Sequence, residues 1–405
     1  LLLALVQFVK DLRSNNLLSF FKRSALLLCA ALLACGTDYT RLATTMEYGK
    51  DTIRGKSELT NDVDNKTTGL DRDYATQWSY GIAETMTLLI PNFYGGSSQG
   101  ELGLDSETYK QIRRAPNAKK IMKSLPLYWG DQPIVNGPTY AGAIVVFLFV
   151  LGLLFVKSEI RIWLLLATIM SIMLAWGKNF MFLTDLFLDY FPGYNKFRAV
   201  STILIIAEFT FPLLAFLALN KFLLSDNQEK LDLKNKEKLL KTAFCVTGGI
   251  ALLFALVPSL CLSLLGVETP FVGLQDSVLQ KNGWPIEALQ SDRATLLSVD
   301  AWRSFFFIAC AFVLLWMFIK SKIKVKYLML ILGSLIIVDM WTVNKRYLND
   351  SHFSRASKVE RPYQKTVADQ QILSDSDPNF RVFNQSVSTF NDASTSYFHK
   401  SIGGY

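Results

Sequence analysis

The chain has 405 residues, of which 51% are hydrophobic and only 19% are charged, and its mean hydropathy is +0.25. Soluble globular proteins carry about 25% charged residues, and here the apolar residues form long blocks, so the composition excludes an ordinary soluble domain and indicates a membrane protein. The net charge of +8 does not indicate a nucleic-acid-binding protein, because most basic residues lie in short segments between these blocks.

Cysteine and histidine usage argues against a disulfide framework and against a metal centre. All five cysteines lie in or beside apolar blocks, and the two histidines, His352 and His399, are too few for a histidine-based metal site. The chain begins at Leu1 within an apolar block and stops in a polar segment, so we expect a fragment of a longer protein.

Apolar blocks along the chain predict a bundle of transmembrane helices, each needing roughly 20 residues. Leu1–Val9 is expected to be the end of one span. Seven further candidates follow: Ser24–Ala43, Thr139–Val156, Ile162–Trp176, Ala199–Leu219, Thr242–Leu265, Trp302–Ile319 and Tyr327–Val343. The predicted fold class is mostly α and polytopic.

Basic residues predict the orientation of the bundle. Every second connection is short and rich in Lys and Arg, at 10–23, 157–161, 221–241 and 320–326. One alternation places all four on the cytoplasmic side. The predicted organisation is then a first hairpin at 1–43, a large outer loop at 44–138, a six-helix bundle at 139–343 and an outer soluble segment at 344–405. A bacterial cytoplasmic membrane is the expected location.

The large loop has two stretches of interest. Gln77–Gly96 is apolar at its centre, too short to span and ended by Pro91, so it predicts a re-entrant or interfacial segment. In Leu127–Pro138, Trp129, Asp131, Gln132 and Asn136 resemble a carbohydrate-contacting set, because sugar faces stack on indole rings and sugar hydroxyls bind amides and carboxylates. The alternative is a packed polar loop without a ligand.

A second outer segment departs from the charge rule. Asn179–Phe191 predicts an interfacial helix with Asp185 and Asp189 on one face, four residues apart. Lys178, Lys196 and Arg198 flank this helix on the outer side. They either bind a specific lipid phosphate or extend to ordinary phospholipid headgroups.

Two carboxylates lie within predicted spans. Glu208 is near the middle of its span, and Asp339 is near the outer end of the last one. An acid in the bilayer costs at least about 2.5 kcal/mol, so each is either functional or held by hydrogen bonds within the bundle. In the final polar segment, Phe380–Asn384 and Ser386–Phe390 are expected to be strands of an α/β or β domain.

Six stretches of the chain resemble motifs of the YfhO family of bacterial membrane proteins, in the same order and over nearly the whole chain. They read TIRGKSELT (52–60), QWSYGIAETMTLLIPNFYGG (77–96), YWGDQP (128–133), AWGKNF (175–180), FPGYNKFRA (191–199) and SIGGY (401–405). That family is similar to the GT-C glycosyltransferases, so the resemblance implies a GT-C-like helix bundle.

The resemblance implies transfer of a sugar from a polyprenyl-phosphate carrier to a cell-envelope glycan or polymer on the outer face, with no cofactor. The expected partners are membrane lipid, the lipid-linked sugar and the acceptor, and not nucleic acid. The usual catalytic carboxylate lies in an earlier loop, so we expect this fragment to lack it. Lipid-phosphate candidates are Lys196, Arg198, Lys178, Arg54 and Lys56. Candidates for sugar or acceptor contact are Trp78, Glu84, Trp129, Asp131, Gln132 and Asn195.

Two other functions stay open at this point. A lipid or glycan transporter would use an intramembrane acid, and Glu208 favours it. A scaffold for envelope assembly would depend on no single polar residue.

Overall fold

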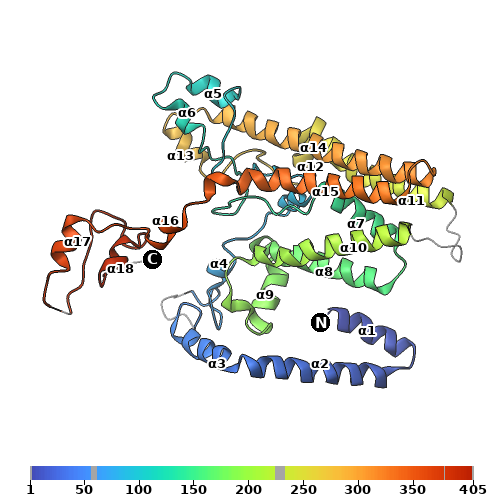
Figure 1. The fold of residues 1–405 in the computed structure, drawn as a ribbon, viewed down its shortest axis with the longest axis horizontal. Helices are drawn as coiled ribbons and strands as arrows, with labels where there is room; N and C mark the ends of the chain where they lie inside the picture. The colour runs from blue at the N-terminus through green and yellow to red at the C-terminus, as the bar shows by residue number, and fades with distance from the viewer. Residues whose placement is uncertain (1, 56–61, 224–232, 378, 404–405) are drawn as a thin grey trace. The chain divides into compact units, whose positions relative to one another are not determined.

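The computed structural model describes residues 2–55, 62–223, 233–377 and 379–403, and it is mostly helical (Figure 1). The chain forms two compact units, Leu1–Tyr347 and Leu348–Tyr405. The longer helices of the first unit are α1 (Leu2–Arg13), α2 (Leu17–Thr37), α3 (Tyr39–Tyr48), α7 (Ala143–Phe155), α8 (Glu159–Ala175), α9 (Met181–Tyr190), α10 (Ile205–Leu223), α11 (Leu233–Leu256), α12 (Pro258–Leu264), α14 (Ile286–Ile319) and α15 (Val325–Tyr347). Its short helices are α4 (Arg72–Ala75), α5 (Glu107–Ile112), α6 (Ala118–Ile121) and α13 (Asp276–Lys281).

Several helices are long and apolar enough to cross a membrane, as a multi-pass protein requires. Within the described residues there are five: Leu17–Thr37, Val200–Leu223, Leu233–Leu256, Ile286–Ile319 and Val325–His352. A sixth results if the pair Glu159–Ala175 and Gly177–Tyr190, bent by 115°, is one broken span. The helix α7 has only 13 residues, because residues 139–142 are irregular and Gly142, with a φ of +98°, directly precedes the helix.

Several expected spans have different limits in the structure. The span expected at Ser24–Ala43 corresponds to α2 (Leu17–Thr37) and the start of α3. The block Thr242–Leu265 is divided at Pro258 into α11 and α12, because proline has no N–H to continue the helical ladder. The span expected from Trp302 belongs to the 34-residue helix α14, which begins at Ile286. Its first turns carry charged side chains that bind other segments, and they therefore do not read as an apolar block.

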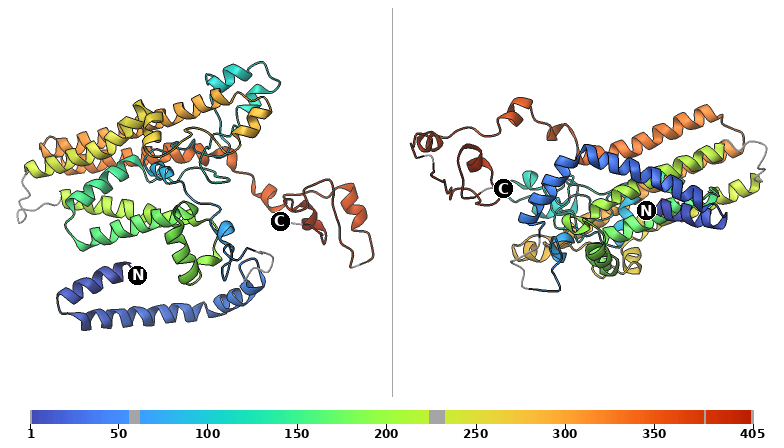
Figure 2. Two further views of the ribbon diagram at one scale, coloured as in Figure 1. Left: turned by 180° about the vertical axis from the view of Figure 1, so that it is seen from behind. Right: turned by 90° about the horizontal axis from the view of Figure 1, so that it is seen from below.

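The hydrophobic core lies among α7, α10, α11 and α14, where α11 packs along α14 and α10 packs along α7 (Figures 1 and 2). Gly152 of α7 allows a close approach, because a Cβ there would lie 2.8 Å from Leu214 Cγ and 3.3 Å from Ala218 Cβ of α10. Small residues at such contacts are typical of membrane helix pairs.

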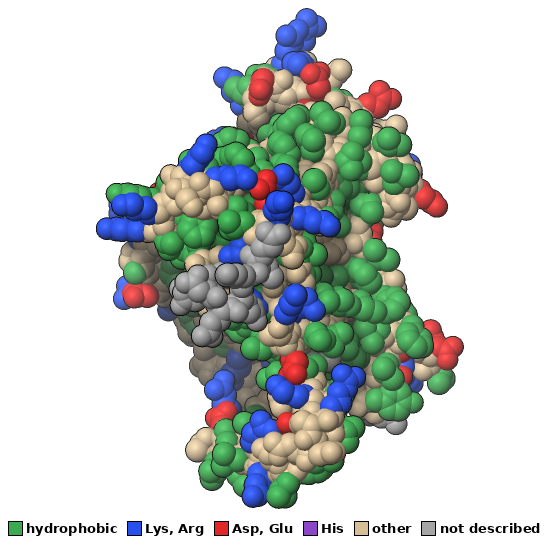
Figure 3. All heavy atoms as spheres, turned by 90° about the vertical axis from the view of Figure 1, so that its right-hand side faces the viewer, with side chains coloured by type: hydrophobic (Ala, Val, Ile, Leu, Met, Phe, Trp, Pro, Cys, Tyr) green, Lys and Arg blue, Asp and Glu red, His purple; other side chains and the backbone are tan. Residues whose placement is uncertain are grey.

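The described residues of the basic connections lie together at one end of the first unit. Lys10 of α1 forms an ion pair with Glu159 at the start of α8 (2.9 Å), and Lys320 after α14 pairs with Glu237 of α11 (2.8 Å). Figure 3 shows Lys and Arg side chains gathered over this face. The predicted alternation requires this arrangement, and assignment of this end to the cytoplasm stays a prediction.

The second unit contains η6 (Asp350–His352), α16 (Ala356–Glu360), α17 (Val367–Ile372) and α18 (Ser394–Phe398). The expected strands at 380–384 and 386–390 are wrong for the described residues, where this stretch makes only one parallel bridge, from Val382 to Ser401. A strand needs a continuous partner for its backbone N–H and C=O groups, and a single bridge does not supply one.

A buried arginine fixes the first half of α14 to two loop segments. Arg293 is only 1% exposed and pairs with Asp276 through both terminal nitrogens, at 2.6 and 3.0 Å. The same nitrogens donate to the carbonyls of Phe271 (2.7 Å) and Pro126 (2.6 Å). This one side chain therefore joins α14 to the 266–285 connection and to the large polar segment.

We predict that Arg293→Met strongly destabilises the protein, because it leaves the Asp276 carboxylate buried without a cation. Breaking one partner of a buried pair costs about 3–5 kcal/mol. Thermal unfolding of the purified protein in neutral detergent measures this effect as a lower melting temperature. The control, Arg114→Met, removes an exposed arginine and is expected to change little. Equal melting temperatures for the two variants would contradict the prediction.

Candidate functional site

The segment Gln77–Gly96 is folded into the hydrophobic core instead of forming a span. Its apolar residues Ile90 and Phe93 are completely buried among the helices. The hydroxyl of Ser304 on α14 donates to the Leu89 carbonyl (2.8 Å). These contacts hold the short helix η2 (Ala83–Leu88), which carries Glu84, against the bundle.

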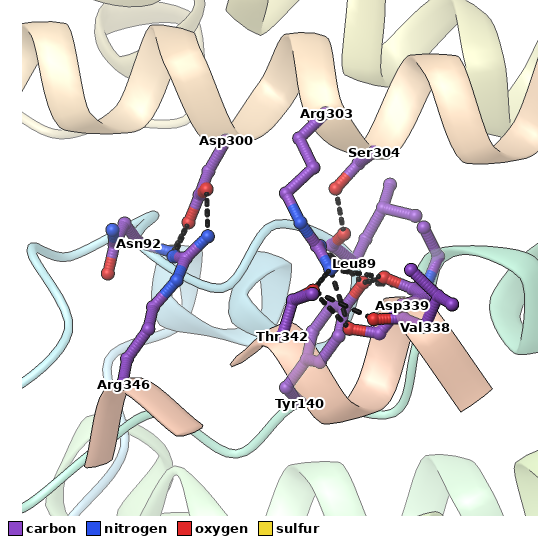
Figure 4. Close-up of polar contacts among 11 residues, drawn as sticks. Leu89, Asn92, Tyr140, Asp300, Arg303, Ser304, Val338, Asp339, Thr342 and Arg346 are labelled. Atoms are coloured by element: carbon purple, nitrogen blue, oxygen red, sulfur yellow. Dashed lines mark hydrogen bonds and ion pairs between the residues drawn. The ribbon is translucent and has the colours of Figure 1, made fainter. Parts of the chain in front are cut away.

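Ion pairs between α14 and α15 support this arrangement (Figure 4). Asp300 of α14 accepts from Asn92 N (3.1 Å) and binds both terminal nitrogens of Arg346, at 2.6 and 2.8 Å. The loop carrying Asn92 is thus bound to a carboxylate that is itself paired with α15.

Both carboxylate oxygens of Asp339 bind other groups of the protein. One of its oxygens accepts from the Tyr140 hydroxyl (2.7 Å), and the other accepts from Ala143 N (2.9 Å) at the start of α7. Arg303 lies 2.9 Å from the same carboxylate (Figure 4). Of the two alternatives from the sequence, the geometry therefore supports a structural role, in which Asp339 caps a helix of another part of the chain.

Glu84 places a buried carboxylate in the large polar segment. It is 2% exposed, and its carboxylate accepts from Gly81 N (3.0 Å), the Tyr128 hydroxyl (2.8 Å) and Gln132 Nε2 (3.0 Å). Burial raises the pKa of Glu84 to about 7, although these three donors favour its ionised form. A carboxyl group with a pKa near neutrality can take up or release a proton under physiological conditions.

Glu84 lies at the wall of a cavity of about 70 Å³ with both polar and apolar lining groups. The cavity is also lined by Tyr80, Tyr128, Gln132 and Ser201. It has room for several water molecules or for a hydroxyl group of a substrate. Burial raises the pKa of both Tyr80 and Tyr128, and the nearby Glu84 charge raises it further. Both phenols are therefore neutral hydrogen-bond donors at any physiological pH.

The structure brings together only some of the expected sugar or acceptor contacts. Glu84 and Gln132 meet, and Asp131 is close enough for its charge to raise the pKa of Glu84. Trp129 is 4% exposed and stacks on Tyr94 with ring centroids 4.0 Å apart, so its faces are covered. Sequence reasoning did not single out Tyr128, whose position between Leu127 and Trp129 gave no signal of a contact with a residue 44 positions away.

Two further candidates bind parts of the chain itself. Asn195 is buried, and its amide donates to the Thr68 hydroxyl (2.8 Å). The indole N–H of Trp78 donates to the Ile134 carbonyl (3.0 Å), which fixes the ring beside Arg198. Both side chains thus join segments that are far apart in the sequence.

The expected lipid-phosphate ligands differ in whether their cationic groups already donate hydrogen bonds to other parts of the chain. Lys196 donates to the carbonyls of Arg54 (2.9 Å) and Thr68 (2.5 Å), and Arg54 Nε donates to the Lys196 carbonyl (3.0 Å). Arg198 is exposed, donates to the Tyr74 hydroxyl (2.6 Å) and lies over the Trp78 ring at 4.3 Å. Lys178 is also exposed. Lys56 lies outside the described residues.

The helix predicted at 179–191 is present as α9, and its two aspartates share a partner. Arg72 donates to Asp185 (2.9 Å) and to both oxygens of Asp189 (2.7 and 2.8 Å). The carboxylates raise the pKa of Arg72 against a desolvation effect that lowers it. Their spacing was visible in the sequence, but the arginine that binds them was not.

Comparison of the chain with protein-family models, curated proteins and solved structures finds no match. Among the described residues, no group of three or more His, Cys, Asp or Glu side chains is arranged to hold a metal ion. The fold and the site define a mostly helical protein with several apolar helices suited to a membrane and a buried, titratable carboxyl group beside a cavity.

We predict that Glu84 makes stability depend on pH. Its pKa is about 7 in the folded protein and about 4.5 when unfolded, so the folded state binds the proton more tightly. The contribution of Glu84 to stability is therefore greatest below pH 4.5 and decreases by about 3 kcal/mol as the pH rises through 7. Melting temperatures of the wild type and Glu84→Gln across this range measure the difference. Parallel curves for the two proteins would contradict the prediction.

Proposed function

We propose that the chain is part of a membrane glycosyltransferase that moves a sugar from a polyprenyl-phosphate carrier to a hydroxyl group of a cell-envelope acceptor. The observation that supports this most is the buried Glu84 carboxyl group, with a pKa of about 7, beside a cavity large enough for a hydroxyl. The YfhO-like motifs supply the class of donor, and the outer face of a bacterial cytoplasmic membrane is the proposed location.

Glu84 would act as the general base, in place of the carboxylate that the GT-C resemblance locates in an earlier loop. The acceptor oxygen attacks the anomeric carbon, its proton passes to the Glu84 carboxylate, and the bond from that carbon to the phosphate oxygen breaks. The bonding electrons leave with the polyprenyl phosphate. The donors from Gly81, Tyr128 and Gln132 hold the carboxylate in place before the proton arrives. A base with this pKa is about half ionised at neutral pH, close to the optimum for proton transfer.

Arg198 would stabilise the leaving phosphate. Its guanidinium is exposed, is oriented by two aromatic rings and is not paired with a carboxylate among the described residues. Arginine binds phosphate through two parallel hydrogen bonds, which suits this role. Lys196 would contribute positive charge while its ammonium holds the chain's own carbonyls.

A transporter for a lipid or glycan is the second candidate. The supporting observation is Glu208, an acid within an apolar helix that lines a groove in the bundle. Reconstituted vesicles separate the two functions, since a transporter moves its substrate without breaking the bond between sugar and phosphate.

Glu84→Gln in the full-length protein should reduce sugar transfer by roughly 10²–10⁴-fold, the usual contribution of a general base. Transfer is measured in membranes with polyprenyl-phosphate hexoses radiolabelled in the sugar. The wild-type rate should rise with pH through about 7, where Glu84 ionises. Glu101→Gln, which removes an exposed carboxylate, is the control. Wild-type transfer by a folded Glu84→Gln protein would exclude the proposed base.

Arg198→Gln should lower the rate at limiting donor by about tenfold or more, because a charge-assisted hydrogen bond to phosphate is worth about 1.5–3 kcal/mol. The same assay with varied donor concentration measures this effect. Arg114→Gln is the matched control at an exposed arginine. Equal rates for the two variants would show that Arg198 does not bind the donor phosphate.

A further inference from the structure

A second cavity lies at one end of the helix bundle, beside the Glu84 cavity. Its volume is about 450 Å³, within the usual range for a small-molecule site. It is lined by the first turns of α7 and α10 and by the last two turns of α15. Pro138 lines both cavities, so the two are adjacent. These helix ends adjoin the polar segments of the chain.

The lining of this groove combines apolar side chains with the polar side chains of Tyr140, Glu208, Asn344 and Tyr347. Val145, Pro212, Met340 and Val343 contribute apolar surface that suits an acyl chain. Glu208 contributes a carboxylate from the first turn of α10. The groove thus has the amphipathic character of a site for a lipid.

Glu208 has no hydrogen-bond or ion-pair partner within the part of the chain that the structure describes. Asp339, in contrast, has three. The backbone adds a second acceptor, because Pro212 lies four residues later and has no N–H to donate to the Glu208 carbonyl. Pro212 also lines the groove, so the Glu208 carboxylate and this carbonyl belong to the same stretch of α10.

We propose that this groove binds a phospholipid with a primary-ammonium headgroup, such as phosphatidylethanolamine. The ammonium group has three N–H donors and a positive charge, which match the Glu208 carboxylate and carbonyl. A trimethylammonium group has the charge but no N–H, and an anionic headgroup is repelled. The acyl chain lies against the apolar wall. This site does not depend on Glu84 and goes beyond the proposed transfer reaction.

The test uses the purified protein in neutral detergent, with equal amounts of phosphatidylethanolamine, phosphatidylcholine and phosphatidylglycerol added, and native mass spectrometry of the retained lipid. We expect about tenfold preference for phosphatidylethanolamine, the effect of one charge-assisted hydrogen bond. Glu208→Gln should lose this preference. Glu268→Gln, which removes an exposed carboxylate outside the groove, should keep it.

A second variant tests the groove itself without changing its charge. Ala141→Phe places a ring into the space and should reduce retention of lipids with every headgroup. Equal retention of the three lipids by the wild type would overturn the proposal. So would an unchanged preference in Glu208→Gln, a loss of preference in Glu268→Gln, or normal retention in Ala141→Phe. Circular dichroism and melting temperature establish that each variant is folded.

Discussion

The buried charges along α14 are the constraint on which the rest of the first unit depends. Asp300 and Ser304 lie seven and eleven residues after Arg293, so the three side chains share one face of α14. Each binds a loop segment or another helix: Arg293 binds the Pro126 carbonyl, Asp300 binds Asn92 and Arg346, and Ser304 binds the Leu89 carbonyl. A helix that begins in polar surroundings and continues into an apolar block thus anchors the polar segments to the bundle.

This anchoring produces the environment of Glu84. The loop that carries Glu84 is held among apolar side chains, where desolvation outweighs three hydrogen bonds and raises its pKa. Had the same loop lain in solvent, Glu84 would be an ordinary surface acid. The cavity, the neutral phenols and the titratable carboxyl group therefore follow from one packing arrangement, which supports our choice of Glu84 as the base.

The two acids within the candidate spans, Glu208 and Asp339, show how the fold distributes polar groups. Asp339 is satisfied by a tyrosine, a backbone N–H and an arginine, and it contributes to the start of α7. Glu208 lies in a similar position on α10 and has no such partners among the described residues. An intramembrane carboxylate is expensive, so a ligand or a proton is expected to satisfy it. This difference between Asp339 and Glu208 supports the proposed lipid site.

The sequence by itself determined the apolar helices, the alternation of basic connections and the helix with Asp185 and Asp189 on one face. These features depend on hydropathy, charge and helical period, which are local properties of the chain. Only the tertiary structure decided that Glu84 meets Tyr128 and Gln132, 44 and 48 residues away, because burial depends on segments that are distant in sequence. It also decided that a tryptophan suited to sugar stacking is covered by Tyr94. The local sequence pattern indicated which polar residues were candidates for a site, and tertiary packing decided that Glu84 titrates near neutral pH.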